Sequence, residues 1–240
     1  MWPWEHLAVG YIGYSLSVRL AGRGVPRPRP VVALAVGTQF PDLVDKPLSW
    51  TLGVLPSGHS LAHSLFAALP LATLAVTVGV ALDRRRDGTT SDRRRDGTTS
   101  DRRRDGDVTE RRRAGDALAG GRTGAAFAFG YLTHLPGDAL YPLLAGGPPN
   151  YDFLFWPLAA VSSAETGVGF AEMVRTLLAR YVERLARGEV SPYLALELGL
   201  LASVVALWVA DGLPPLRWLW SRLVVGRPAE ESRADTENSR

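Results

Sequence analysis

The chain has 240 residues, no cysteine and a formal net charge of +3 at pH 7, so disulfides and thiolate metal sites are excluded. Hydrophobic residues make up 46% of it and charged residues 21%, but long apolar runs alternate with arginine-rich blocks. A soluble domain of this length would spread its charges over many amphipathic elements. The segregation predicts a membrane protein.

Five apolar segments are predicted to enter the membrane, whose hydrocarbon core takes about 20 helical residues to cross. They are residues 7–20, 31–40, 61–82, 123–135 and 193–209. The first, second and fourth are shorter than a usual span, so we expect flanking residues or partners to complete the crossing. The predicted fold class is an all-α, polytopic membrane helical bundle of about five segments, formed by residues 1–82 and 117–226.

A charged repeat separates the two parts of this bundle. The sequence DRRRDGTTS occupies residues 83–91, recurs at 92–100 and begins again at 101. It contains no apolar residue and cannot bury surface to offset its ordering entropy, so we predict a disordered loop over 83–116. Aspartates flank each arginine triplet, so we expect no nucleic-acid partner. The polar residues 227–240 are predicted to form a disordered tail.

Two segments of the second part are predicted to lie at the membrane surface. Residues 141–157 are rich in Pro, Gly and aromatic residues, as in an interfacial loop. Residues 172–187 place Met173, Leu177 and Tyr181 on one face of an amphipathic helix. Such a helix lies on the membrane or covers a site.

The arginine blocks predict the orientation, because short loops rich in Lys and Arg stay cytoplasmic. The blocks lie at residues 19–29, 84–113 and 217–227. If all three are cytoplasmic, the chain crosses the plasma membrane five times and its N-terminus is extracytoplasmic.

Histidines and aspartates gather at segment ends on that extracytoplasmic side. Spacings of four, as between His59 and His63 and between His134 and Asp138, place both members of a pair on one helix face. Ionisable residues at membrane depth are costly and usually functional. Imidazole and carboxylate suit a divalent metal, zinc first, with manganese or magnesium as alternatives. The predicted metal ligands are His6, Asp42, Asp45, His63, His134 and Asp138.

Each of these residues alone has a simpler explanation. His6 would be an interfacial residue at a helix end, and Asp42, after Pro41, would be a turn or N-cap residue. Asp138, after Gly137, would also be a cap. Their common placement on one side of the membrane favours the metal site.

At these positions the sequence resembles the membrane-bound metal-dependent hydrolases, also described as LexA-binding inner-membrane hydrolases. The matching motifs are His6, PDLVD at 41–45, GHSLAHS at 58–64 and GYLTHLPGD at 130–138. This family is distantly similar to zinc-dependent phospholipase C and single-strand-specific nucleases, whose zinc ions activate water on a phosphoester. Two departures stand out: His59 replaces the family arginine, and the Asp42–Asp45 pair has two residues between its members where many relatives have one.

The resemblance implies a membrane-embedded hydrolase that acts on a phosphoester or lipid-linked substrate. Asp42 or Asp45, when not bound to metal, would be the general base. His59 would bind metal or stabilise the leaving group. Two alternatives stay open: a non-catalytic protein with a structural His/Asp cluster, and a transporter with acidic cation sites. The sequence predicts the lipid bilayer as a partner and leaves the oligomeric state open.

Overall fold

A computed structural model describes residues 1–95, 119–144, 146–162, 169–188 and 192–225. Within them the protein forms seven α-helices and no β-strand, which confirms the all-α class. The helices are α1 (Pro3–Leu20), α2 (Pro28–Lys46), α3 (Leu65–Arg95), α5 (Ala119–Leu144), α6 (Phe170–Ala186), α7 (Pro192–Ala210) and α8 (Pro214–Val225). A π-helical turn, Pro47–Thr51, follows α2, and a short 3₁₀ helix, Asp152–Phe155, follows α5. The predicted tail at 227–240 lies outside the described residues.

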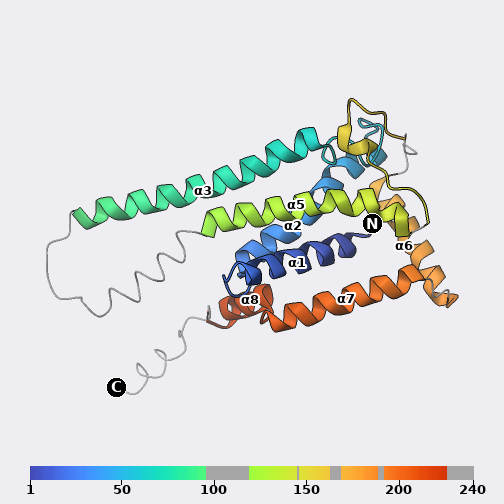
Figure 1. The fold of residues 1–240 in the computed structure, drawn as a ribbon. Helices are drawn as coiled ribbons and strands as arrows, with labels where there is room; N and C mark the ends of the chain where they lie inside the picture. The colour runs from blue at the N-terminus through green and yellow to red at the C-terminus, as the bar shows by residue number, and fades with distance from the viewer. Residues whose placement is uncertain (96–118, 145, 163–168, 189–191, 226–240) are drawn as a thin grey trace, which may run out of the picture.

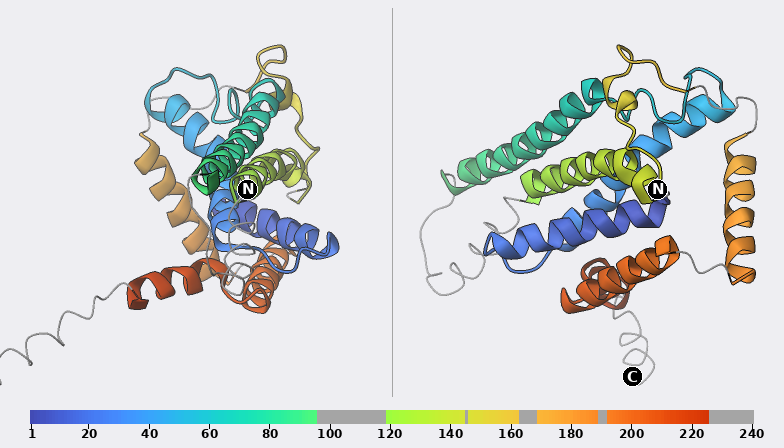
Figure 2. Two further views of the ribbon diagram at one scale, coloured as in Figure 1. Left: turned by 90° about the vertical axis from the view of Figure 1, so that its left-hand side faces the viewer. Right: turned by 45° about the vertical axis from the view of Figure 1, so that its right-hand side comes forward.

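The helices form one elongated bundle with a crosswise helix at each end. Helices α1, α2, α3, α5 and α7 run lengthwise (Figure 1), and α5 packs mainly against α2 and α3. Helix α6 instead lies across the end of the bundle where the chain begins, and α8 lies across the opposite end (Figure 2). The predicted amphipathic helix therefore covers the end where the chain begins.

Flanking residues lengthen the three short segments, so that α1, α2 and α5 contain 18, 19 and 26 residues. Helix α2 continues through Pro41 to Lys46, and α5 continues through Pro136 and Pro142. The motif residues at the ends of the apolar segments therefore lie inside helices, Asp42 and Asp45 in the last turns of α2 and His134 and Asp138 within α5. The apolar run stops there, but the helical backbone continues because its polar side chains face one another inside the bundle.

Helix α3 is displaced from the predicted segment at both ends. It begins at Leu65, because the backbone N–H groups of the preceding residues 60 and 62 donate hydrogen bonds to the buried Asp45 carboxylate. At its other end it extends beyond residue 82 to Arg95. Asp83, the first residue of the predicted loop, is a buried helical residue. Its oxygens accept hydrogen bonds from the backbone N–H groups of Gly120 and Gly121, at 2.8 and 2.7 Å, and satisfy the start of α5. Residues 96–118, the rest of that loop, lie outside the described part.

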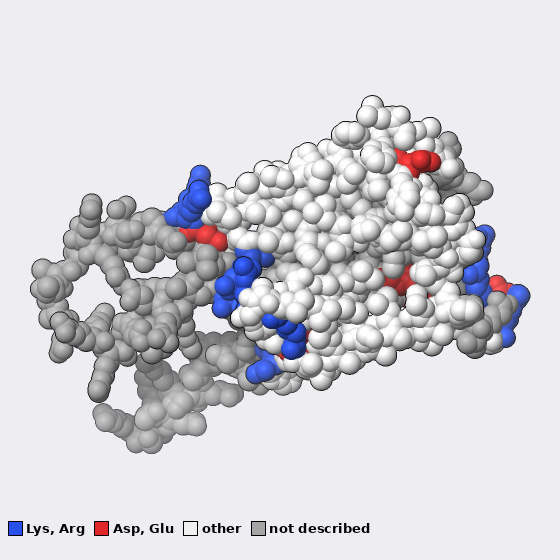
Figure 3. Space-filling model, in the orientation of Figure 1, with Lys and Arg blue, Asp and Glu red and all other residues white. Residues whose placement is uncertain are grey.

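Two described helices are by themselves long and apolar enough to cross a membrane, fewer than the five predicted. They are residues Leu65–Arg85 of α3 and Pro192–Ala210 of α7. The others carry charged residues near their ends, as α2 does with Arg29, Asp42 and Lys46. A broad face with almost no charged side chains nevertheless separates the charged ends of the molecule (Figure 3).

Glycines allow α5 to approach both neighbours closely. A Cβ atom at Gly124 would lie 2.1 Å from the carbonyl oxygen of Ala75 on α3. A Cβ atom at Gly37 of α2 would lie 2.2 Å from the carbonyl oxygen of Phe127 on α5. Small residues at such contacts let membrane helices pack backbone to backbone.

A polar contact ties α1 to the far end of α7. The buried Asp211 carboxylate accepts hydrogen bonds from Tyr11 Oη at 2.7 Å and Ser15 Oγ at 2.6 Å. Arg19 pairs with the same carboxylate through its guanidinium. This contact helps to hold α1 in the bundle at the end opposite α6.

We expect Gly124→Ala to lower the thermal stability of the detergent-purified protein, because the new methyl group forces α3 and α5 apart. The cost should be about 1–3 kcal/mol. Gly199→Ala on α7 is the matched control, since no atom lies within 4 Å of a Cβ placed there. Equal unfolding temperatures for the two variants would contradict the close approach.

Candidate metal centre

The predicted site residues converge at the end of the bundle where the chain begins. His6 lies in the first turns of α1, Asp42 near the end of α2, and His134 and Asp138 on α5, while the loop before α3 supplies two histidines. We call six of these residues the His/Asp cluster: His6, Asp42, His59, His63, His134 and Asp138. All are buried except His59, whose side chain is 39% exposed.

One carboxylate oxygen, Oδ2 of Asp138, lies at the centre of the cluster. The Nε2 atoms of His134, His63 and His59 lie 3.1, 3.4 and 3.4 Å from it. The oxygen is buried and accepts no hydrogen bond from a described residue. A buried carboxylate oxygen without a partner is costly, so its surroundings favour a cation.

The Nε2 atoms of His63 and His134 face each other at 3.0 Å. His134 Nδ1 lies 2.7 Å from the Thr38 carbonyl oxygen, which can only accept, so this nitrogen carries the proton. His63 Nδ1 donates in the same way to Asp45 at 2.8 Å. In the neutral rings both Nε2 lone pairs therefore point at the same small volume, which requires a proton or a metal ion there.

Asp45 supports the cluster from outside rather than joining it. Its oxygens accept hydrogen bonds from the backbone N–H groups of Ser60, Ala62 and His63 at 2.8, 2.9 and 3.2 Å, and a fourth from the His63 ring. It belongs to neither group of candidate ligands. Asp45 was predicted as a metal ligand, but in the structure both of its oxygens accept hydrogen bonds from the loop before α3.

The electrostatics of the loop histidines follow from these contacts. Burial lowers the pKa of His63, but the carboxylates around it, Asp138 first, outweigh this effect and raise the pKa to about 10. Burial lowers the pKa of His59, against the opposing effect of Asp138. Without a metal, the cluster therefore keeps a proton on His63, close to the position that a bound cation would take.

The cluster contains two groups of ligand atoms that could each hold an ion. One consists of Asp42, His59, His63 and Asp138, and the other of His6, His134 and Asp138. Both groups include Asp138, so its carboxylate could bridge two ions. Both ring nitrogens of His6 and Oδ1 of Asp42 are buried without a hydrogen bond from a described residue. These unpartnered nitrogen and oxygen donors fit a divalent metal such as zinc.

Comparison with known protein families identifies the family of this chain. The family model of the YdjM inner membrane protein covers residues 1–213. The chain belongs to this YdjM family. The match spans the whole cluster together with α6 and α7, and it supports a location in the membrane. No curated protein and no solved structure matches the chain.

Sequence reasoning misses three contacts of the cluster. The first is the Met1 ammonium group, which lies 2.9 Å from Asp138 Oδ1. The Thr38 carbonyl that orients His134 is a backbone group, which no residue pattern reveals. Lys46 Nζ lies 2.5 Å from Asp42 Oδ2. The spacing of four between Lys46 and Asp42 could have indicated this pair.

We expect Asp45→Asn to lower the thermal stability of the metal-free protein and to weaken zinc binding by about 10–100-fold, as for other residues that orient a metal ligand. The amide keeps the size of the side chain but loses the charge and one acceptor. Asp152→Asn, at an exposed position of the short 3₁₀ helix, is the control. Unchanged melting and unchanged zinc affinity in Asp45→Asn would contradict the supporting role.

Proposed function

We propose that this YdjM-family protein is a membrane-embedded, metal-dependent hydrolase of phosphoester or lipid-linked substrates. The observation that carries the proposal is the buried Asp138 Oδ2 atom, which accepts no hydrogen bond from the described part of the chain and lies within 3.4 Å of three imidazole nitrogens. A stable protein tolerates such a carboxylate when a cation completes the site.

The ligands of the proposed metal are His6, Asp42, His63, His134 and Asp138, and zinc suits this donor set best. When bound, the metal would polarise the phosphoester and lower the pKa of a water molecule. The hydrolysis joins the water oxygen to phosphorus, breaks the bond to the leaving alcohol, and returns a proton to that alcohol.

The protein's own groups divide the remaining work. Asp45 and the Thr38 carbonyl hold the two facing imidazoles in place. Asp42 would offer one oxygen, Oδ1, to the metal, and its other oxygen, Oδ2, would be the general base, because Asp45 has no unused oxygen. His59, the exposed member of the cluster, stabilises the leaving-group oxygen.

A pocket beside the cluster favours catalysis over a purely structural metal site. Its volume is about 740 Å³, and Asp42 and Lys46 form part of its wall. Catalytic zinc sites keep an open coordination position, whereas structural sites are closed. The pocket would give a substrate access to Asp42.

The proposed topology places five lengthwise helices, α1, α2, α3, α5 and α7, across the membrane. Arg19 lies at the opposite end of α1 from His6. By the arginine rule, the His/Asp cluster then lies on the extracytoplasmic side. In this arrangement α6, which crosses the bundle end, lies along the membrane surface (Figure 2).

We expect the purified protein to retain zinc, up to one ion for each group of ligands, when its metals are measured by elemental mass spectrometry. Asp138→Ala should lose all of it, because both groups use this carboxylate. His6→Ala should lose only the share bound with His134. Glu183→Gln, on the exposed side of α6, is the control and should keep the full content.

Two results would contradict the proposal. Absence of metal after incubation with zinc, manganese and magnesium would remove the metal centre. Stoichiometric metal without turnover on phosphoester and phospholipid panels would leave a structural site instead of a hydrolase.

A further inference from the structure

The pocket beside the metal centre has an apolar wall built from distant parts of the chain. Trp2 lies just before α1 and Trp4 in its first turn, while Trp50 belongs to the π-helical turn. Helix α6 contributes Leu177 and Leu178. Its volume of about 740 Å³ falls within the range of sites that enclose small molecules, roughly 300–1,000 Å³. Such a wall favours an apolar ligand.

Helix α6 is held over this pocket at both of its ends. The backbone N–H of Phe170 donates to Thr51 Oγ1 at 2.9 Å, and its ring stacks on Trp50. Toward the other end, Tyr181 Oη donates to Glu197 of α7 at 3.0 Å. Between these anchors the apolar face of α6 stays partly uncovered: Val174 is 41% exposed and Leu178 45%. In the proposed topology this face borders the bilayer, so that an acyl chain could enter from the lipid.

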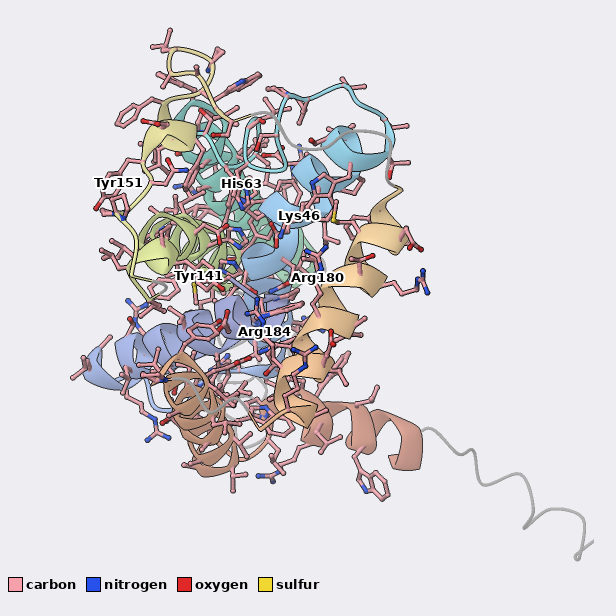
Figure 4. The ribbon with its side chains drawn as sticks, turned by 90° about the vertical axis from the view of Figure 1, so that its right-hand side faces the viewer. Lys46, His63, Tyr141, Tyr151, Arg180 and Arg184 are labelled. Carbon is pink, nitrogen blue, oxygen red and sulfur yellow. The ribbon has the colours of Figure 1, made fainter. Side chains whose placement is uncertain are left out.

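The same pocket carries three cationic side chains, Lys46, Arg180 and Arg184. Figure 4 shows Lys46 on α2 and the two arginines on the neighbouring α6. Arg180 and Arg184 are four residues apart on α6 and therefore share a face. Neither forms an ion pair with a residue in the described ranges.

The other two arginines of the helix are already neutralised. Arg175 pairs with Glu172 at 2.7 Å, and Arg187, at the end of α6, pairs with Glu183 at 2.5 Å. Neither of them lines the pocket. The uncompensated charge of α6 is thus confined to the pair that faces the pocket.

The two acidic residues of the pocket wall are engaged by other groups. Asp42 pairs with Lys46. Oε1 of Glu197 accepts hydrogen bonds from Trp4 Nε1 at 2.6 Å and from Tyr181, while its Oε2 is buried without a hydrogen bond from a described residue, and neither acid pairs with Arg180 or Arg184. The two arginines therefore remain available to an anion from outside. Guanidinium groups bind phosphate through paired, charge-assisted hydrogen bonds.

We propose that this pocket binds an anionic glycerophospholipid, with an acyl chain against the tryptophans and leucines and the headgroup phosphate at Arg180, Arg184 and Lys46. Because Asp42 lies in the same wall, the phosphate would be held beside the metal centre. The idea that this lipid is the substrate rests on the proposed function. The proposal that the lipid binds in the pocket is independent of that function.

Quenching of tryptophan fluorescence by brominated lipids tests the binding, since three tryptophans line the pocket. Metal-free protein is reconstituted in phosphatidylcholine nanodiscs that contain a small fraction of either brominated phosphatidic acid or brominated phosphatidylcholine. We expect half-maximal quenching at an about tenfold lower fraction of the acidic lipid. Equal quenching by the two lipids would overturn the proposal.

The charge pair is tested with two double variants of α6. Arg180→Gln with Arg184→Gln should abolish the preference for the acidic lipid, whereas Arg175→Gln with Arg187→Gln should keep it. All four arginines are exposed, so both proteins are expected to fold, and their melting temperatures verify this. A preference that survives in the first variant would refute the role of the arginines.

The outcome is independent of the metal centre, because the lipid is measured without metal and without turnover. Selective lipid binding by a protein that holds no metal would support the pocket and remove the hydrolase. Metal-dependent hydrolysis of a water-soluble phosphoester, without lipid selectivity, would support the hydrolase and overturn the pocket proposal.

Discussion

The burial of the Asp138 carboxylate among imidazoles is the constraint on which the rest of the structure depends. A charge so placed is stable only if its surroundings are fixed and complementary. Helix α5 provides this because it packs between α2 and α3, and glycines at the contacts allow the backbones to touch. His134 and Asp138 can then reach residues on both neighbours and on α1. The close helix packing is therefore a condition for the site as well as for the fold.

The cluster is rigid on its inner side and open on its outer side. On the inner side, the Asp45 carboxylate and the Thr38 carbonyl each fix one imidazole ring. On the outer side, His59 is partly exposed and Asp42 borders a pocket closed by α6 rather than by the bundle. Side chains held in fixed positions beside an accessible pocket are typical of reactive centres. The inner hydrogen bonds hold the side chains in place, and the pocket lets another molecule reach them.

Sequence patterns predicted the features that depend on local chemistry. Segregated charge indicated an all-α membrane protein, and the arginine blocks together with the positions at segment ends placed the histidines and aspartates on one side. The different role of Asp45 could not be predicted, because only the folded loop shows that its oxygens meet the N–H groups of residues 60, 62 and 63. The pocket could not be predicted from the sequence either, because its wall combines the first residues of the chain with residues of α6 and α7, which are distant in sequence. Contacts of this kind arise from tertiary packing and leave no period in the sequence.

Lys46 connects the two halves of the proposed mechanism. Its ammonium group pairs with Asp42 at 2.5 Å and also forms part of the pocket wall. A phosphate bound there would compete with Asp42 for this one cation. If Lys46 turned toward the phosphate, the second oxygen of Asp42 would lose its partner and would be free to accept a proton. In the proposed mechanism, arrival of the anionic headgroup would thus itself release the general base, so that the base becomes available only when a substrate is in place.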